Sequence, residues 1–166
     1  MEKTRKITIT GIMAALIAVM TAYVFHIPVG VNGGYIHFGD ALIFLSATLL
    51  PKTYAMAAAA IGGGMADLLT APMWVPATVA VKSMLVLAFN NKSAKIITIR
   101  NILAIILGYF ISVFGYFFAE YLLFGNWSLL IVSMLRNLVQ TAGSAVVFIV
   151  LGLALDRAKI KTRILV

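Results

Sequence analysis

Apolar segments separated by short polar connections make up almost the whole chain. Six such segments follow one another in the 166 residues. An apolar stretch of about 20 residues is long enough to cross a bilayer as an α-helix. The pattern therefore predicts an all-α membrane protein that forms a single integral membrane domain over residues 1–166. The six expected transmembrane helices cover approximately residues 7–25, 40–50, 53–69, 76–89, 101–124 and 129–155.

The second apolar segment is shorter than the others and follows a polar connection. It begins near Asp40, which we expect to be the N-cap of the helix, and it stops at Pro51. About 10 residues at 1.5 Å each cannot cross roughly 30 Å of hydrocarbon, so this helix must be tilted, extended or shielded by protein. The preceding connection, residues 26–39, is rich in glycine and has alternating side chains. These features indicate an ordered outer loop with a short extended piece, which could fold over a site.

Lysine and arginine residues mark alternate connections between the apolar segments. Eleven of the thirteen lie near the N-terminus, at Lys52, in residues 92–100 or near the C-terminus. The intervening connections, residues 26–39, 70–75 and 125–127, contain none. Because basic loops of membrane proteins stay in the cytoplasm, both termini are predicted to be cytoplasmic.

The composition excludes most classes of soluble protein. Hydrophobic residues make up 63% of the chain and charged residues only 11%, against about 25% charged residues in a typical soluble domain. A net charge of +8 would suggest a nucleic-acid partner in a soluble protein, but topology and anionic lipid account for it here. We therefore expect the lipid bilayer as a partner and no nucleic acid. With no cysteine and two histidines, and without a phosphate-binding or hydrolytic motif, we expect no metal site and no cofactor.

Ionisable residues inside apolar segments are the first candidates for a functional site, because a charge within the membrane is costly and is usually paired or functional. On the predicted topology, all of them lie in the outer half of the bilayer. The helix segments nearer the cytoplasm are almost wholly apolar, whereas an ion channel carries polar groups through the full depth of the membrane. The pattern predicts a pocket that opens outward and is closed below. The five residues are Asp40, Asp67, Lys82, Glu120 and Arg136.

These candidates also have structural interpretations. Asp67 and Lys82 fit a structural ion pair between the third and fourth helices, and Glu120 can reach the interface. Amide side chains can join helices by hydrogen bonds, and aromatic side chains can belong to an interfacial belt. Arg136 is harder to explain in this way, because it lies too deep in its helix to reach water fully. The residues expected to contact a substrate are Asn32, Tyr35, His37, Trp74, Lys82, Tyr116, Glu120, Trp127, Arg136, Asn137 and Gln140.

Small residues recur on one face of the first helix. Ala14, Ala18 and Ala22 are spaced four residues apart, with Gly11 and Ala15 on an adjoining stripe. Small side chains let two helices approach closely in a membrane. The face therefore fits packing against the other helices of this chain, or docking of another membrane subunit.

A specific family resemblance rests on short stretches in the first half of the chain. These stretches are Ala14-x-x-x-Ala18, Ile36-His-Phe-Gly-Asp40, Leu50-Pro-Lys52, Ala66-Asp-Leu-Leu69, Pro76 and Lys82. Together with the six-helix plan, they resemble the substrate-binding S components of energy-coupling factor (ECF) vitamin transporters. The match covers most of residues 7–90, and the second half of the chain agrees mainly in topology and polar placement.

The resemblance implies a high-affinity substrate-binding subunit of an ATP-driven vitamin importer in a prokaryotic cell membrane, and not an enzyme. It implies that the alanine face of the first helix docks on the transmembrane coupling subunit EcfT, which two cytoplasmic ATP-binding subunits drive. It also implies a site near the outer face, roofed by the connection at residues 26–39.

Family members bind riboflavin, hydroxymethylpyrimidine or vitamin B6 compounds. The mixture of acids, bases, amides and aromatics favours a small hydroxylated heteroaromatic, such as a vitamin B6 compound or hydroxymethylpyrimidine, with riboflavin as the alternative. An alternative of another class is a small intramembrane enzyme that uses Asp67 or Glu120 for acid–base chemistry. A small structural or accessory membrane protein is the third class of function that the sequence allows.

Overall fold

The computed structural model describes residues 2–24, 26–28 and 35–165 of the chain. The described part is almost entirely helical, which confirms the predicted all-α class. Its only strands are two short ones, and they pair antiparallel, with Ile27 opposite Ile36, inside the connection where an extended piece was expected. The elements are α1 (Lys3–Ala22), β1 (Ile27–Pro28), β2 (Tyr35–Ile36), α2 (Asp40–Leu49), α3 (Lys52–Thr70), the 3-10 helix η1 (Pro72–Trp74), α4 (Val75–Ala88), α5 (Ile99–Phe124), α6 (Leu129–Arg157) and α7 (Ile160–Leu165).

The ends of the helices follow local sequence signals. The Thr98 side chain caps α5 by accepting a hydrogen bond from the backbone N–H of Asn101, and Gly125 ends the helix with a φ of 65°. Only glycine adopts that left-handed conformation at low cost. Pro51 stands immediately before α3 and Pro76 lies in the first turn of α4, where a missing N–H costs little. The helix boundaries were therefore largely predictable, whereas the short α7 was not anticipated.

Helix α2 lies in the middle of the bundle. It contacts α1, α3, α4 and α6, and every one of its residues except Leu42 is buried. Its Phe44 ring stacks on Phe89 at a centroid distance of 4.8 Å and meets the edge of Phe148 at 5.9 Å. A helix that is apolar on all sides needs such a buried position. Of the three explanations for its short length, shielding by protein is the one that the structure supports.

Helices α1 and α3 cross closely at a glycine. A Cβ atom at Gly62 would lie 2.7 Å from both the carbonyl oxygen of Ala14 and the Cβ of Ile17. Ala14 and Ala22 are both buried. Part of the small-residue face of α1 is therefore used inside this chain.

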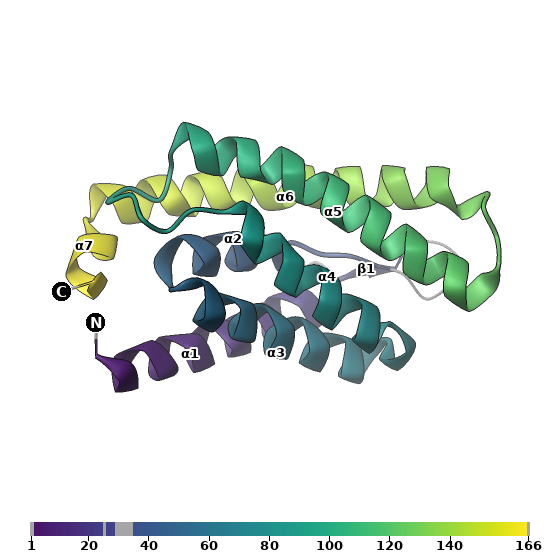
Figure 1. Cartoon of the computed structure of the whole chain (residues 1–166), viewed down its shortest axis with the longest axis horizontal. Coiled ribbons are helices and arrows are strands. Elements are labelled where there is room, and N and C mark those ends of the chain that lie inside the picture. Colours follow the sequence, from purple (N-terminus) through teal and green to yellow (C-terminus); the bar gives the residue numbers. More distant parts are fainter. Residues whose placement is uncertain (1, 25, 29–34, 166) are drawn as a thin grey trace.

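The two ends of the bundle differ in charge. Figure 1 shows both termini at one end, with the α2–α3 turn and the α4–α5 connection beside them, and the β1–β2 region and the α5–α6 turn at the other end. The basic segments of the sequence thus gather at one end. Asp156 accepts hydrogen bonds there from the backbone N–H groups of Ile96 and Ile97, at 2.7 and 2.9 Å, and fastens the α4–α5 connection to α6.

Three of the described helices, α1, α5 and α6, are long and apolar enough to span a membrane. Helices α2 and α4 are shorter apolar helices. The structure therefore supports an integral membrane protein, while the count of six crossings and the inward orientation of the termini stay predictions.

Candidate functional site

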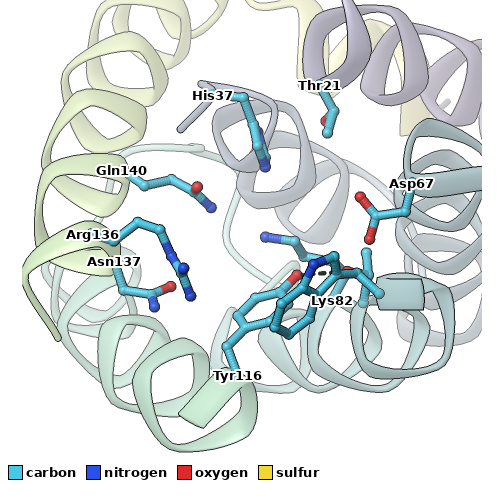
Figure 2. A pocket seen from close by; sticks show the side chains of 10 residues that line it. Thr21, His37, Asp67, Lys82, Tyr116, Arg136, Asn137 and Gln140 are labelled. Atoms are coloured by element: carbon cyan, nitrogen blue, oxygen red, sulfur yellow. Dashed lines mark hydrogen bonds between the residues drawn. The ribbon is translucent and has the colours of Figure 1, made fainter. Parts of the chain in front are cut away.

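A pocket lies at the end of the bundle opposite the termini. It encloses about 450 Å³ of empty space, counting the space at its mouth. Figure 2 shows Arg136, Asn137 and Gln140 on one side of it and Asp67 on the opposite side. The lining residues are Thr21, His37, Asp67, Trp74, Thr78, Lys82, Tyr116, Arg136, Asn137 and Gln140.

A buried ion pair lies at the base of the pocket. The Nζ atom of Lys82 lies 2.6 Å from Oδ1 of Asp40, and each side chain is 2% exposed. The other carboxylate oxygen of Asp40 accepts a hydrogen bond from Nε2 of Gln140 at 2.8 Å. Both oxygens of one carboxylate are thus engaged, and the contacts join α2, α4 and α6.

This pair corrects two expectations drawn from the sequence. The ion-pair partner of Lys82 is Asp40 and not Asp67, although Asp67 lines the same pocket. Asp40 is also not an N-cap, because Gly39 holds the cap position and no side-chain cap hydrogen bond is formed. The physical reason is the central position of α2, which places its first residue opposite Lys82, so that its carboxylate meets a buried ammonium group instead of the helix's own N–H groups.

A second ion pair holds the arginine of the pocket. Nη2 of Arg136 lies 2.5 Å from Oε1 of Glu120, with 11% and 3% of the two side chains exposed. Arg136 lines the pocket, whereas Glu120 is not among the lining residues. Glu120 therefore positions the guanidinium group, and its expected contact with a substrate stays a prediction.

The two amides beside Arg136 are anchored through their nitrogen atoms. Nδ2 of Asn137 donates to the backbone carbonyl of Ser133 at 2.8 Å, and Nε2 of Gln140 donates to Asp40. Because an amide group offers an acceptor oxygen as well as its nitrogen donors, each side chain keeps an oxygen for recognition of a ligand donor.

Aromatic residues of η1 and α5 form another part of the wall. The Tyr116 hydroxyl is 2.9 Å from Oγ1 of Thr78, and Nζ of Lys82 lies 5.3 Å from the centre of the Tyr116 ring. That distance fits a cation–π contact. Trp74 lines the pocket and packs against Tyr116.

Trp127 differs from Trp74 and does not line the pocket. It is 66% exposed and packs on Tyr121 and Phe117 at ring distances of 4.6 and 5.6 Å. An exposed tryptophan on a membrane protein fits an interfacial belt. The structure thus places Trp127 outside the pocket, and its expected contact with a substrate stays a prediction without support from this structure.

His37 reaches the pocket from the connection before α2. It is buried, and its Nδ1 atom accepts a hydrogen bond from the backbone N–H of Gly39 at 3.0 Å. Burial lowers the pKa of His37 to about 3, with the Asp40 carboxylate opposing the shift and Lys82 adding to it. The imidazole is thus neutral, with its proton on Nε2. Two other residues expected from the same connection, Asn32 and the side chain of Tyr35, lie outside the described residues.

Sequence analysis missed two residues at this site and expected a third, Asp40, to cap its helix. Thr21 and Thr78 line the pocket, and no sequence signal distinguishes them from other threonines in membrane helices. Asp40 had a usable signal, because it is the single ionisable residue of an otherwise apolar ten-residue helix. A lone carboxylate of that kind predicts a buried cationic partner.

A shallow apolar groove lies on another surface, between α1 and α3. Ala14 and Ala18, two of the expected docking residues, line this groove. Ala22, the third, is 5% exposed and lies outside it. Two of the three expected docking residues thus lie at this groove, and docking of a partner there stays a prediction. The groove residues are Thr10, Gly11, Ala14, Ala15, Ala18, Ile61 and Met65.

The first prediction concerns the partner of Lys82. We expect Asp40→Asn and Lys82→Met each to lower the free energy of unfolding by about 3–5 kcal/mol, because each leaves an uncompensated buried charge. The double variant should lose less than the sum of the two losses. Thermal unfolding in detergent measures this. Asp67→Asn combined with Lys82→Met is the matched control and should depart less from additivity than the Asp40 cycle does. Additivity in the Asp40 cycle would contradict the pairing.

The second prediction concerns His37. Its folded-state pKa of about 3 is below the roughly 6.5 of an unfolded histidine, so the unfolded chain binds more protons between these values. The stability that His37 contributes is therefore present above about pH 6.5 and is lost as pH falls toward 3. We expect His37→Asn, which keeps an acceptor for the Gly39 N–H, to flatten the fall in melting temperature between about pH 7 and pH 4.5. His26→Asn is the control. If the melting temperature of His37→Asn falls with pH as steeply as that of the wild type, groups other than His37 cause the fall.

Comparison with known proteins agrees with the geometry. A protein of Pyrococcus woesei, described as an uncharacterized protein in gap 3′region, is 29% identical over 108 residues, which is 64% of this chain and 72% of the relative. Residues 1–157 match the family described as ECF-type riboflavin transporter, S component. An apolar bundle with a buried polar pocket at one end is what such a substrate-binding subunit requires, and the match extends over nearly the whole chain. The chain belongs to the family of S components of ECF-type riboflavin transporters.

Proposed function

We propose that this chain is the high-affinity substrate-binding subunit of an ATP-driven importer in a prokaryotic cell membrane, and that its substrate is a small hydroxylated heteroaromatic such as a vitamin B6 compound or hydroxymethylpyrimidine. Family membership supports the transporter subunit. The polar pocket at the end opposite the basic segments supports an outward-facing binding site, because basic segments stay in the cytoplasm.

The lining of the pocket carries the choice of substrate. Amide and guanidinium groups on α6 face a wall that contains Asp67 and Tyr116. Such a lining suits one ring with several polar substituents better than a large fused ring system.

Riboflavin is the second candidate substrate. The family description itself favours it, because it names riboflavin transporters. The pocket opens at its mouth, and a longer ligand could extend through it. A binding experiment in which riboflavin competes with the small heteroaromatic compounds decides between the two candidate substrates.

The third prediction tests the binding site. Calorimetry on the purified protein should find one submicromolar ligand among pyridoxine, hydroxymethylpyrimidine and riboflavin. Asn137→Ala and Arg136→Gln should each weaken its binding by at least roughly tenfold, or about 1.4 kcal/mol, because each removes a polar group from the pocket wall. Arg100→Gln, at the opposite end of the bundle, is the control and should bind as the wild type does. If both pocket variants are folded and bind the ligand as tightly as the wild type does, the binding site lies away from α6.

We also propose that the α1–α3 groove docks the transmembrane coupling subunit EcfT, which two cytoplasmic ATP-binding subunits drive. Gly11 and Ala15 are exposed in the isolated chain and line the groove. A Cβ atom at Gly11 would meet nothing within 4 Å. A partner helix can approach closely at such small residues.

The fourth prediction tests this docking face. Gly11→Trp or Ala15→Trp should abolish copurification with the coupling subunit and abolish substrate uptake, because the indole fills the groove. Binding of substrate to the isolated chain should stay unchanged, since both positions are remote from the pocket. Ile12→Trp is the matched control, because Ile12 is 54% exposed on α1 and does not line the groove. If Gly11→Trp and Ala15→Trp still copurify with the coupling subunit, the groove contacts lipid and not the partner.

A further inference from the structure

The indole N–H of Trp74 is a buried donor at the wall of the pocket. Trp74 is 4% exposed, and its Nε1 atom has no hydrogen-bond partner within the described ranges of the chain. Buried donors are nearly always satisfied in native proteins, because an unsatisfied one loses its hydrogen bonds to water without replacement. A donor of this kind at a ligand pocket indicates an acceptor that arrives with the ligand.

The Trp74 ring already packs against two other aromatic rings. Its ring centre lies 6.3 Å from that of Tyr116, at an interplanar angle of 67°, and 6.3 Å from that of Phe124, at 50°. Since the residue is also almost fully buried, little of either face is offered to the pocket. The structure therefore favours recognition of a ligand through the edge of the indole over stacking on its face.

Most other strong donors near Trp74 are occupied by protein groups. The ammonium group of Lys82 is held by Asp40, and the amide nitrogen of Gln140 donates to the same carboxylate. Arg136 uses one nitrogen for Glu120, and a guanidinium group has further N–H donors. Of these four side chains, Trp74 is the one whose donor atom has no protein partner within the described ranges.

We propose that Trp74 is a specificity-determining residue whose Nε1–H donates to an acceptor in the plane of the substrate ring, such as an unprotonated ring nitrogen or a ring carbonyl oxygen. This inference rests on the proposed function. It defines the substrate class further, as a nitrogen heteroaromatic that is uncharged at the atom facing η1. Indole is a donor only, so it accepts such an atom and rejects an N–H or a protonated ring nitrogen at the same place.

The chain contains two tryptophans, so the proposal can be tested on the donor itself. In protein labelled with ¹⁵N-tryptophan and held in detergent micelles, two indole N–H signals are expected, and Trp127→Phe assigns them. Saturation with whichever of pyridoxine, hydroxymethylpyrimidine or riboflavin binds should move the Trp74 proton signal downfield and leave the Trp127 signal in place. An unmoved Trp74 signal under saturating ligand overturns the proposal.

Affinity provides a second, independent measurement. Trp74→Phe keeps an aromatic ring against Tyr116 and Phe124 and removes the N–H, and we expect at least a tenfold loss of affinity by calorimetry. Trp127→Phe is the matched control and should change affinity less than twofold. A ligand analogue with C–H in place of the acceptor nitrogen should lose affinity for the wild type and lose little more in Trp74→Phe, because the two changes remove the same contact.

The outcomes separate this inference from the proposed function. If none of the three compounds binds the wild-type protein, the proposed substrate class fails and the inference fails with it. If a compound binds and Trp74→Phe binds it as tightly as the wild type does, the substrate class stands and only the role of Trp74 is overturned. Thermal unfolding of Trp74→Phe shows whether a loss of affinity reflects a loss of fold.

Discussion

Burial of the Lys82 ammonium group against the Asp40 carboxylate is the constraint on which the rest of the site depends. Neither charge can leave its partner without becoming an isolated ion in a low-dielectric interior, and such an ion is strongly destabilising. The pair joins α4 to the first residue of α2, and Gln140 extends the contact to α6. The start of α2 is therefore fixed in the middle of the bundle, directly after the connection that carries His37.

The pairing of Lys82 with Asp40 also determines which polar groups of the pocket remain available for hydrogen bonds to a ligand. Because Lys82 and Asp40 neutralise each other, they give the pocket shape and polarity without adding net charge to its base. Arg136 is likewise held by Glu120 behind the wall. The groups that keep a donor or acceptor for a ligand include the guanidinium group, the amide oxygens of Asn137 and Gln140, and the indole N–H of Trp74. Under the proposed function, these groups distinguish substrates by the pattern of hydrogen-bonding atoms on their rings.

The bundle separates three features in space. One end carries the basic segments and both termini, the other end carries the pocket, and the α1–α3 groove lies on the side. Gly62 allows α1 and α3 to cross closely, so the small residues of α1 serve internal packing and still leave a groove. A chain with this division can bind a substrate at one place and a partner subunit at another.

The sequence by itself determined the helices, their approximate ends, the asymmetry of the basic residues and the depth of the polar ones. These features follow from local patterns, in which apolar length predicts a helix and glycine or proline marks where it stops.

Tertiary structure alone decided which polar groups meet. The sequence gives Lys82 two candidate carboxylates of similar depth, and only the central position of α2 selects Asp40 over Asp67. Trp74 and Trp127 look alike in the sequence because each lies near a turn at the same end of the bundle, yet one lines the pocket and the other is exposed. The physical reason is that composition and periodicity place a residue along a helix axis, whereas the rotation of each helix about that axis is set by packing against neighbours distant in the sequence.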